Sequence, residues 1–168
     1  MMGLYYGEME SPLGTMTIVS DGLKIVRIDF GSFVEIEAKL QRWSKRYFEE
    51  AVFIQKPEKV SQATEELCDY FQEGRQNFTF DYAFYGTPFQ QKVWQALNDI
   101  PYGDTKTYKD IAQAIHNPKA VRAVGGAVNK NPFSIVVPCH RVLGANGKLV
   151  GYGGGLDKKE FLLIHESE

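Results

Sequence analysis

A cysteine and a histidine stand side by side at Cys139 and His140, between Pro138 and Arg141. The thiolate is the reactive form of cysteine, and a nearby base or cation lowers the pKa of the thiol. Adjacent side chains diverge in helices and in strands, so His140 is expected to reach the Cys139 sulfur through one water molecule rather than directly. The pair indicates either a nucleophilic thiol or an ordinary core residue, because free cysteine is often buried.

The elements around this pair should hold it on a rigid support. The apolar run at residues 135–137 predicts a strand, and Pro138 disfavours a helical conformation of the residue before it. The strand is therefore expected to end there and to present Cys139. A glycine-rich loop follows at residues 151–155, and a helix over residues 157–165 closes the sequence, with its first residue as the cap.

Three helices are predicted before the pair, over residues 87–98, 107–115 and 118–129. The second and third, joined by a tight turn, form a candidate helix-turn-helix, a motif in which the second helix enters a groove of DNA. That helix carries Arg122 on a surface of small side chains, which let a backbone approach another molecule closely. A lone arginine is more often a solvated surface residue. The small residues are Ala120, Ala123, Gly126 and Ala127.

The first half predicts three antiparallel strands and two helices. Alternating apolar residues, together with the turns at residues 11–14 and 21–22, indicate the strands, and apolar residues at helical spacing indicate the helices. The boundary between the two halves is expected near residues 81–86, which gives an α/β domain over residues 1–84 and a mainly helical domain over 85–168. The strands are predicted at 4–10, 15–20 and 23–30, the helices at 33–48 and 58–73, and a further short strand at 78–80.

The composition of the 168 residues is that of a globular protein, with 43% hydrophobic and 24% charged residues. Two cysteines are too few for a disulfide framework or a cysteine-rich zinc site, and no apolar run approaches the length of a membrane span. No signal peptide is visible, so a reducing, cytoplasmic location is expected. Residues 85–150 carry eight Lys or Arg against three Asp, whereas residues 1–84 carry nine against fourteen acidic residues. Any nucleic-acid contact should therefore lie in the basic segment.

Five segments carry a family resemblance by their order and spacing. They are Arg122–Ala127, Asn131-Pro132, Pro138–Val142, Tyr152–Leu156 and His165-Glu166. Together they resemble the O6-alkylguanine-DNA alkyltransferases over residues 87–168, and the acidic first half resembles them less specifically. The resemblance implies an α/β fold, with a ribonuclease H-like N-terminal domain built on a three-stranded antiparallel sheet and a winged helix-turn-helix-like C-terminal domain.

The resemblance also implies a function. Members remove an alkyl group from the O6 atom of guanine in double-stranded DNA after base flipping, with O4-alkylthymine as a second expected substrate. The group moves irreversibly onto the protein's own cysteine, so each molecule acts once. A monomer that needs no cofactor and no metal is implied, since the cysteine and histidine zinc ligands of some members are missing here.

Each candidate residue takes a role from the resemblance. Cys139 would be the nucleophile, His140 a base acting through water, and Glu166, which alone reads as a solvated end, would orient and stabilise His140. Asn131 would be the hinge between the recognition helix and the active-site strand. Tyr108 would rotate the lesion out of the duplex and donate a hydrogen bond to guanine N3.

The remaining roles concern DNA and the base. Arg122 would enter the base stack in place of the flipped guanine, from a helix whose Ala120, Ala123 and Gly126 face DNA. Gly153 stands where some members have serine, a harmless change if only its backbone N–H contacts the base. The guanine pocket would be lined by Tyr152, Gly153 and the backbone of Val142 and Cys139.

Three other functions are weighed against this one. A sensor of alkyl lesions, similar in sequence but with tryptophan in place of the cysteine, would bind damaged DNA and leave it alkylated, and Cys139 argues against it. A helix-turn-helix regulator would show sequence preference and leaves the Pro138–Val142 segment without a role. A cysteine hydrolase would turn over many times, but an adjacent Cys and His are unusual for a direct dyad.

Overall fold

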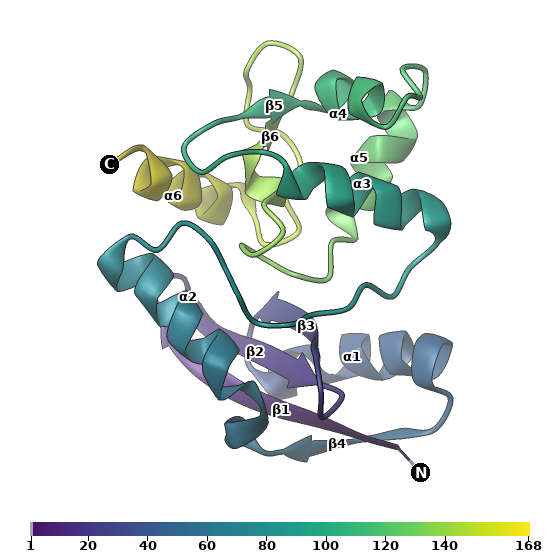
Figure 1. Cartoon of the computed structure of the whole chain (residues 1–168), viewed down its shortest axis with the longest axis vertical. Coiled ribbons are helices and arrows are strands. Elements are labelled where there is room, and N and C mark those ends of the chain that lie inside the picture. Colours follow the sequence, from purple (N-terminus) through teal and green to yellow (C-terminus); the bar gives the residue numbers. More distant parts are fainter. Residues whose placement is uncertain (1) are drawn as a thin grey trace. The chain divides into compact units, whose positions relative to one another are not determined.

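The computed structural model describes residues 2–168, which divide into two compact units (Figure 1). The first unit ends at Tyr85, and the second spans Gly86–Glu168. The first combines a sheet with two long helices, and the second is mainly helical, so the chain has a mixed α/β fold as expected. Within residues 2–168, no helix is both long and apolar enough to cross a membrane.

The sheet of the first unit has four strands in the order β3-β2-β1-β4. The three antiparallel strands expected from the sequence are present, and β4 adds a fourth that pairs parallel with β1. Sequence reasoning missed β4 because it is short and only two of its side chains, Ala51 and Phe53, pack against the core. The strands are β1 (Met2–Ser11), β2 (Gly14–Ser20), β3 (Ile25–Phe30) and β4 (Ala51–Gln55).

Helices α1 (Phe33–Phe48) and α2 (Ser61–Glu73) cover opposite faces of this sheet. Tyr6 of β1 stacks on Phe33 of α1, with ring centroids 3.9 Å apart. The next residue, Gly7, faces Val60 directly before α2, where an added Cβ would lie only 2.7 Å from the valine side chain. Because successive side chains of a strand point to opposite faces, the two helices lie on opposite sides.

Local sequence signals explain where α1 starts and where α2 ends. A capping box between Ser32 and Glu35 starts α1, and Gly74, in the left-handed region at φ 72°, ends α2. The first turn of the predicted helix 58–73 is instead the 3-10 helix η1 (Pro57–Val60). The short strand predicted at 78–80 is wrong, since that segment forms no ladder and only Tyr82 bridges to β3.

A buried ion pair lies beneath α1. Both nitrogens of the Arg27 fork donate to Asp29, at 2.7 Å from Nε and 2.8 Å from Nη2, and Lys39 of α1 donates to the same carboxylate at 3.1 Å. Burial by itself would raise the pKa of Asp29. The charges and hydrogen bonds of Arg27 and Lys39 outweigh burial and hold this pKa below its ordinary value.

Replacing Asp29 by asparagine is expected to lower the free energy of unfolding by roughly 3–5 kcal/mol, because it leaves the Arg27 charge buried without its partner. Urea unfolding measures the change. Asp69→Asn is the matched control, since that carboxylate is 49% exposed and lies 3.6 Å from Arg75 Nη1. Its loss should cost less than about 1 kcal/mol.

The same pair predicts a pH dependence of stability. A carboxyl group whose pKa is lowered by folding contributes its full stability above the pKa of the unfolded chain. That contribution is lost as the pH falls through the pKa of the folded state. The free energy of unfolding should therefore fall more steeply toward acid in the wild type than in Asp29→Asn, and parallel curves would contradict this reading of Asp29.

The second unit is built on three helices that pack against one another, α3, α4 and α5. Trp94 of α3 donates its indole N–H to the carbonyl oxygen of Ala127 in α5 at 2.9 Å, which ties the helix pair to α3. Two short parallel strands, β5 and β6, form a small second sheet. The elements are α3 (Pro88–Asn98), β5 (Lys106–Thr107), α4 (Tyr108–Ala114), α5 (Val121–Asn129), the 3-10 helix η2 (Cys139–Arg141), β6 (Val142–Leu143) and α6 (Leu156–Ser167).

Three predictions for the second unit are wrong: a strand, the start of one helix and the cap of another. Residues 135–137 are not a strand but compact turns, in which Ile135 has φ 72° and the Val137 N–H donates to the Phe133 carbonyl. Helix α5 begins at Val121 rather than at residue 118, because the Asn117 carbonyl accepts the Ala120 N–H in a turn before the helix. Helix α6 begins one residue before Asp157, which lies in its first turn and does not cap it.

Candidate active site

Cys139 opens the 3-10 helix η2 and is 7% exposed. The turn before it is held by the side chain of Asn131, whose Nδ2 donates to the carbonyl oxygens of Val137 at 2.7 Å and Phe133 at 3.2 Å. The Asn131 Oδ1 in turn accepts the Phe133 N–H at 2.9 Å. One amide thus satisfies three backbone groups and connects the end of α5 to the segment that presents the thiol.

Burial raises the pKa of the Cys139 thiol. A hydrogen bond with Asn131, the charge of Lys159 and a hydrogen bond with Tyr152 oppose this effect without cancelling it. Desolvation of the thiolate is the larger effect, so the neighbours lower the pKa of Cys139 by less than burial raises it. A base that takes up the thiol proton would favour the thiolate, which is the nucleophilic form.

His140 is fully buried, and its Nε2 lies 2.7 Å from Oε2 of Glu166 on α6. Burial lowers the pKa of His140, and the charges of Arg141 and Lys159 lower it further, against the opposing effect of Glu166. The imidazole is therefore neutral and donates from Nε2 to the carboxylate. The other nitrogen, Nδ1, has no hydrogen-bond partner among the described residues, so it is a buried lone pair able to accept a proton.

Arg141 completes this buried cluster. Its Nε donates to Glu166 Oε1 at 2.7 Å, and its Nη2 donates to Oε2 at 3.0 Å. Its Nη1 donates to the carbonyl oxygen of Ile100 at 2.6 Å, and the guanidinium lies 5.7 Å from the ring centroid of Tyr102. Sequence reasoning gave Arg141 no role, because only the fold brings Glu166 to it.

Lys159 is a second residue that the sequence analysis missed. Its side chain is buried, and its ammonium group donates to the carbonyl oxygens of Val142, Val150 and Gly151, the last two at 2.9 and 3.2 Å. Burial lowers the pKa of Lys159, while the nearby Cys139 raises it. A usable signal existed, since the buried residues Lys159, Leu162 and Glu166 share one face of α6 at helical spacing.

Two tyrosines form part of the surroundings of the thiol. Tyr108 opens α4 after the capping residue Thr107, and its hydroxyl donates to the Val150 carbonyl at 3.1 Å. Burial raises the pKa of Tyr108, and the charge of Cys139 raises it further. A hydrogen bond with the Tyr152 side chain lowers the pKa of Cys139, against the larger effect of burial. The structure thus brings both rings, predicted from distant parts of the sequence, to the same thiol.

The surface of α5 is separate from this buried cluster. Arg122 is exposed, and so are Ala123 and Gly126, while Ala120 before the helix is half-buried. A Cβ on Gly126 would meet nothing within 4 Å, whereas one on Gly125 would lie 3.9 Å from the Tyr108 ring. Gly126 therefore leaves an open surface that another molecule can approach closely.

Replacing Gly153 by serine is expected to change the free energy of unfolding by no more than about 0.5 kcal/mol. Its φ is not in the left-handed region, and an added Cβ would lie 3.7 Å from the Asn129 carbonyl oxygen, an ordinary contact. The contrasting variant is Gly155→Ser, at φ 104°, whose Cβ would lie 2.8 Å from Asp157 Oδ1. Thermal unfolding of both variants checks the prediction, and equal destabilisation would contradict it.

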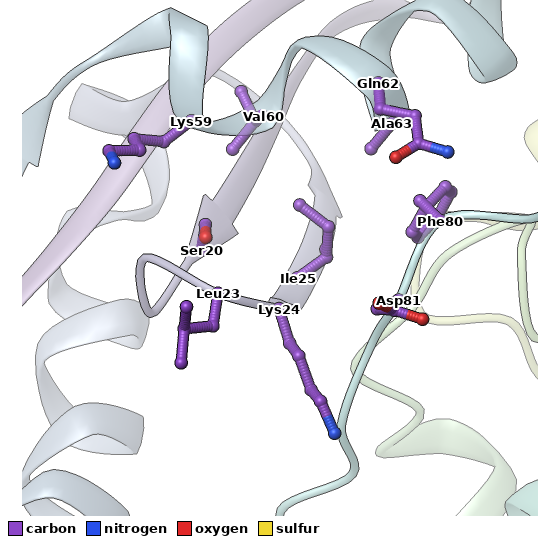
Figure 2. A pocket seen from close by; sticks show the side chains of 10 residues that line it. All are labelled: Ser20, Leu23, Lys24, Ile25, Lys59, Val60, Gln62, Ala63, Phe80 and Asp81. Carbon is purple, nitrogen blue, oxygen red and sulfur yellow. The ribbon is translucent and has the colours of Figure 1, made fainter.

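A pocket of about 100 Å³ in the first unit offers no comparable chemistry. Figure 2 shows its two lysines, Lys24 and Lys59, with their ammonium groups directed away from each other. The other lining residues include neither a cysteine nor a histidine. They are Ser20, Leu23, Ile25, Val60, Gln62, Ala63, Phe80 and Asp81. Within residues 2–168, no cluster of three or more His, Cys, Asp or Glu could hold a metal ion.

Comparison with protein families gives a match for each half of the chain. Residues 4–84 match the family described as the 6-O-methylguanine DNA methyltransferase ribonuclease-like domain. Residues 88–168 match the family described as the 6-O-methylguanine DNA methyltransferase DNA binding domain. The buried cluster and the exposed surface of α5 both lie in the second match.

Individual relatives agree over nearly the whole length. A methylated-DNA--protein-cysteine methyltransferase of Methanosarcina acetivorans is 45% identical over 95% of this chain and 96% of its own. One of Mycolicibacterium paratuberculosis is 50% identical over 96% of this chain and 91% of its own. The crystal structure of Mycobacterium tuberculosis OGT in complex with DNA has a TM-score of 0.82 and 37% identity, over 98% of this chain and 92% of that one.

Proposed function

This chain belongs to the 6-O-methylguanine DNA methyltransferase family, and we propose that it repairs double-stranded DNA by moving the alkyl group of O6-alkylguanine onto Cys139. One observation carries the assignment of the chemistry. Cys139, a buried thiol with a raised pKa, is followed directly in the sequence by His140, whose buried Nδ1 has no hydrogen-bond partner among the described residues and whose Nε2 lies 2.7 Å from Glu166 Oε2. This arrangement supplies a nucleophile that ionises only when its base accepts the proton.

The reaction moves one alkyl group and one proton. His140 takes the proton of Cys139 at Nδ1 through one water molecule, and Glu166 stabilises the imidazolium that forms. The thiolate then attacks the alkyl carbon in line, so that an S–C bond forms while the C–O6 bond breaks and its electron pair passes to guanine. The guanine anion is stabilised by a hydrogen bond from Tyr108 and takes up one proton. The thioether on Cys139 has no easy leaving group, so each molecule acts once.

The alkyl carbon is out of reach while the base is stacked, so the lesion must leave the duplex. Flipping costs a few kcal/mol of unstacking, and an inserted side chain offsets part of that cost by filling the gap. Exposed Arg122 on α5 is the residue for this insertion, with Ala120, Ala123 and Gly126 letting the helix approach the DNA. Binding should be salt-dependent and tolerant of sequence, because the remaining contacts are to phosphates.

The flipped base is received beside the thiol. Tyr108 rotates it out of the stack, and Asn131 couples α5 to the segment that carries Cys139, a role supported by its three backbone hydrogen bonds. O4-alkylthymine is a second substrate of the same site. The pocket is formed by Tyr152, Gly153 and the backbone of Val142 and Cys139.

The setting of the reaction follows from this chemistry. The protein works as a monomer, with no cofactor and no metal, because displacement at an alkyl carbon needs only a nucleophile and a proton acceptor. It works in the cytoplasm, where a reducing environment keeps Cys139 as a thiol. The N-terminal domain covers residues 1–84, and the domain that binds DNA and carries the thiol covers residues 85–168.

The test is the mass of the protein and of its peptides after mixing with an oligonucleotide that contains one O6-methylguanine. One methyl group on the peptide that holds Cys139, with guanine restored in the DNA, is the expected result. A protein that binds the oligonucleotide but stays unmodified would overturn the proposal in favour of a lesion sensor. More than one guanine restored per protein molecule would overturn it in favour of a catalyst that turns over.

A further inference from the structure

Arg141 is a buried side chain that hydrogen bonds fix in place, and it offers little surface for a contact with DNA. It is 6% exposed, and three of its nitrogens donate hydrogen bonds, two to the Glu166 carboxylate and one to the Ile100 carbonyl. We propose that Arg141 is a positioning residue for alkyl transfer, which holds Glu166 so that His140 carries its proton on Nε2 and keeps Nδ1 free to accept another. This inference rests on the proposed function of Cys139.

The two oxygens of Glu166 explain why the arginine matters. Oε1 accepts from Arg141 Nε, while Oε2 accepts from both Arg141 Nη2 and His140 Nε2. Burial disfavours a charged carboxylate, and the guanidinium offsets that effect. A neutral carboxyl at this position could donate its proton to Nε2, which would leave the hydrogen of the neutral imidazole on Nδ1. The base would then have no lone pair to offer on the Nδ1 side.

The charge of Arg141 acts on His140 directly as well. It lowers the pKa of His140, together with burial and the charge of Lys159, against the effect of Glu166. The charged and titratable groups around the imidazole are thus Arg141 of η2, Glu166 and Lys159 of α6, and Cys139, with Tyr102 beside the arginine. Without the guanidinium, His140 would hold a proton at higher pH and would not serve as a base there.

The geometry makes a simple cation a poor substitute. The planar fork of arginine meets a carboxylate with two parallel hydrogen bonds, whereas a lysine ammonium group is a point charge on a flexible chain. The Ile100 carbonyl, which accepts from Nη1, and the Tyr102 ring also contact the guanidinium and help to fix its plane. Arg141→Lys should therefore keep most of the charge and lose the orientation of Glu166.

The experiment compares the wild type with Arg141→Lys and Arg141→Gln in single-turnover methyl transfer from an O6-methylguanine oligonucleotide across a range of pH. Each variant is expected to react at least about 10-fold more slowly at neutral pH, a fraction of what a general base contributes. The acidic limb of the rate profile should move to higher pH, most in Arg141→Gln. The affinity for the same oligonucleotide, measured before reaction, should stay within about 2-fold of the wild type, since Arg141 is 6% exposed and has little surface with which to contact DNA.

A second readout does not depend on activity. In protein labelled with ¹⁵N-histidine, the wild-type His140 should show a protonated Nε2 and an unprotonated Nδ1 at neutral pH, and the Arg141 variants should show imidazolium or the other tautomer. Arg75→Lys is the matched control, since Arg75 pairs with Glu66 at 3.3 Å in the first unit.

Two results would separate the inference about Arg141 from the proposed function of Cys139. If the Arg141 variants lose thermal stability but keep the pH profile and the His140 tautomer of the wild type, Arg141 is only structural and the inference is overturned. If the wild type itself transfers no methyl group, the proposed function fails, whereas the nitrogen signals of His140 still decide whether Arg141 sets its tautomer.

Discussion

Cys139→Ser is expected to abolish transfer of the methyl group to the protein, with a rate at least ~10⁴-fold below that of the wild type. A serine hydroxyl is a much weaker acid than a thiol, and burial already raises the pKa of the group at this position. Binding to the lesion should persist, because the pocket and the surface of α5 are unchanged. Methyl groups incorporated per protein molecule, together with the affinity for the O6-methylguanine oligonucleotide, check both parts.

Cys68→Ser is the matched control for this variant. Cys68 is a half-buried free thiol in α2 of the first unit. It should accept one methyl group per molecule at Cys139 as the wild type does. Methyl transfer by Cys139→Ser at a rate near the wild type, or a methylated Cys68 peptide, would show that the acceptor has been assigned wrongly.

His140→Gln is expected to slow methyl transfer by about 10²–10⁴-fold at neutral pH, the usual contribution of a general base. Without its base the Cys139 thiol must ionise unaided, and burial raises its pKa. The rate of the variant should therefore keep rising with pH into the alkaline range. The wild-type rate should level off at lower pH, because the pKa of His140 is lowered and the imidazole is neutral well below that range. Single-turnover rates over a pH series distinguish the two curves.

The control for this change is His116→Asn. His116 is exposed and has φ 61°, a conformation that asparagine tolerates. Its rate and pH profile should match the wild type. If His140→Gln shows the same pH profile as the wild type, the base is another group, and Lys159 would be the next residue to examine.

Features set by neighbouring residues could be predicted from the sequence. Helices α3 and α4 start where predicted, after Thr87 and Thr107, because each capping box depends on a side chain only three residues away. The turn at Asp21-Gly22 joins β2 and β3 for the same reason. Periodicity likewise placed α1 and α2, whose apolar faces cover the sheet.

Features set by distant residues could not be predicted. The apolar run before Cys139 looked like a strand, but the side-chain amide of Asn131 holds it as turns. The helical spacing of α6 could have placed Lys159 on its buried face, but the carbonyl oxygens that accept from its ammonium group lie 8 to 17 residues away and follow from no local pattern. Only the family resemblance suggested that Glu166 meets His140. The structure places the two 2.7 Å apart, and their roles in the reaction stay predictions.

The Val150 carbonyl oxygen accepts two hydrogen bonds, from the Tyr108 hydroxyl at 3.1 Å and from the Lys159 ammonium group at 2.9 Å. Leaving a fully buried acceptor without any donor costs roughly 1–3 kcal/mol, and the cost is smaller at Val150, which is 41% exposed. If the hydrogen bond from Tyr108 breaks, the Val150 carbonyl still accepts from Lys159, so it does not lose its last donor. If Tyr108 turns toward a base as proposed, the Val150 carbonyl therefore keeps a donor, and the loop that carries Val150 stays bonded to Lys159 of α6.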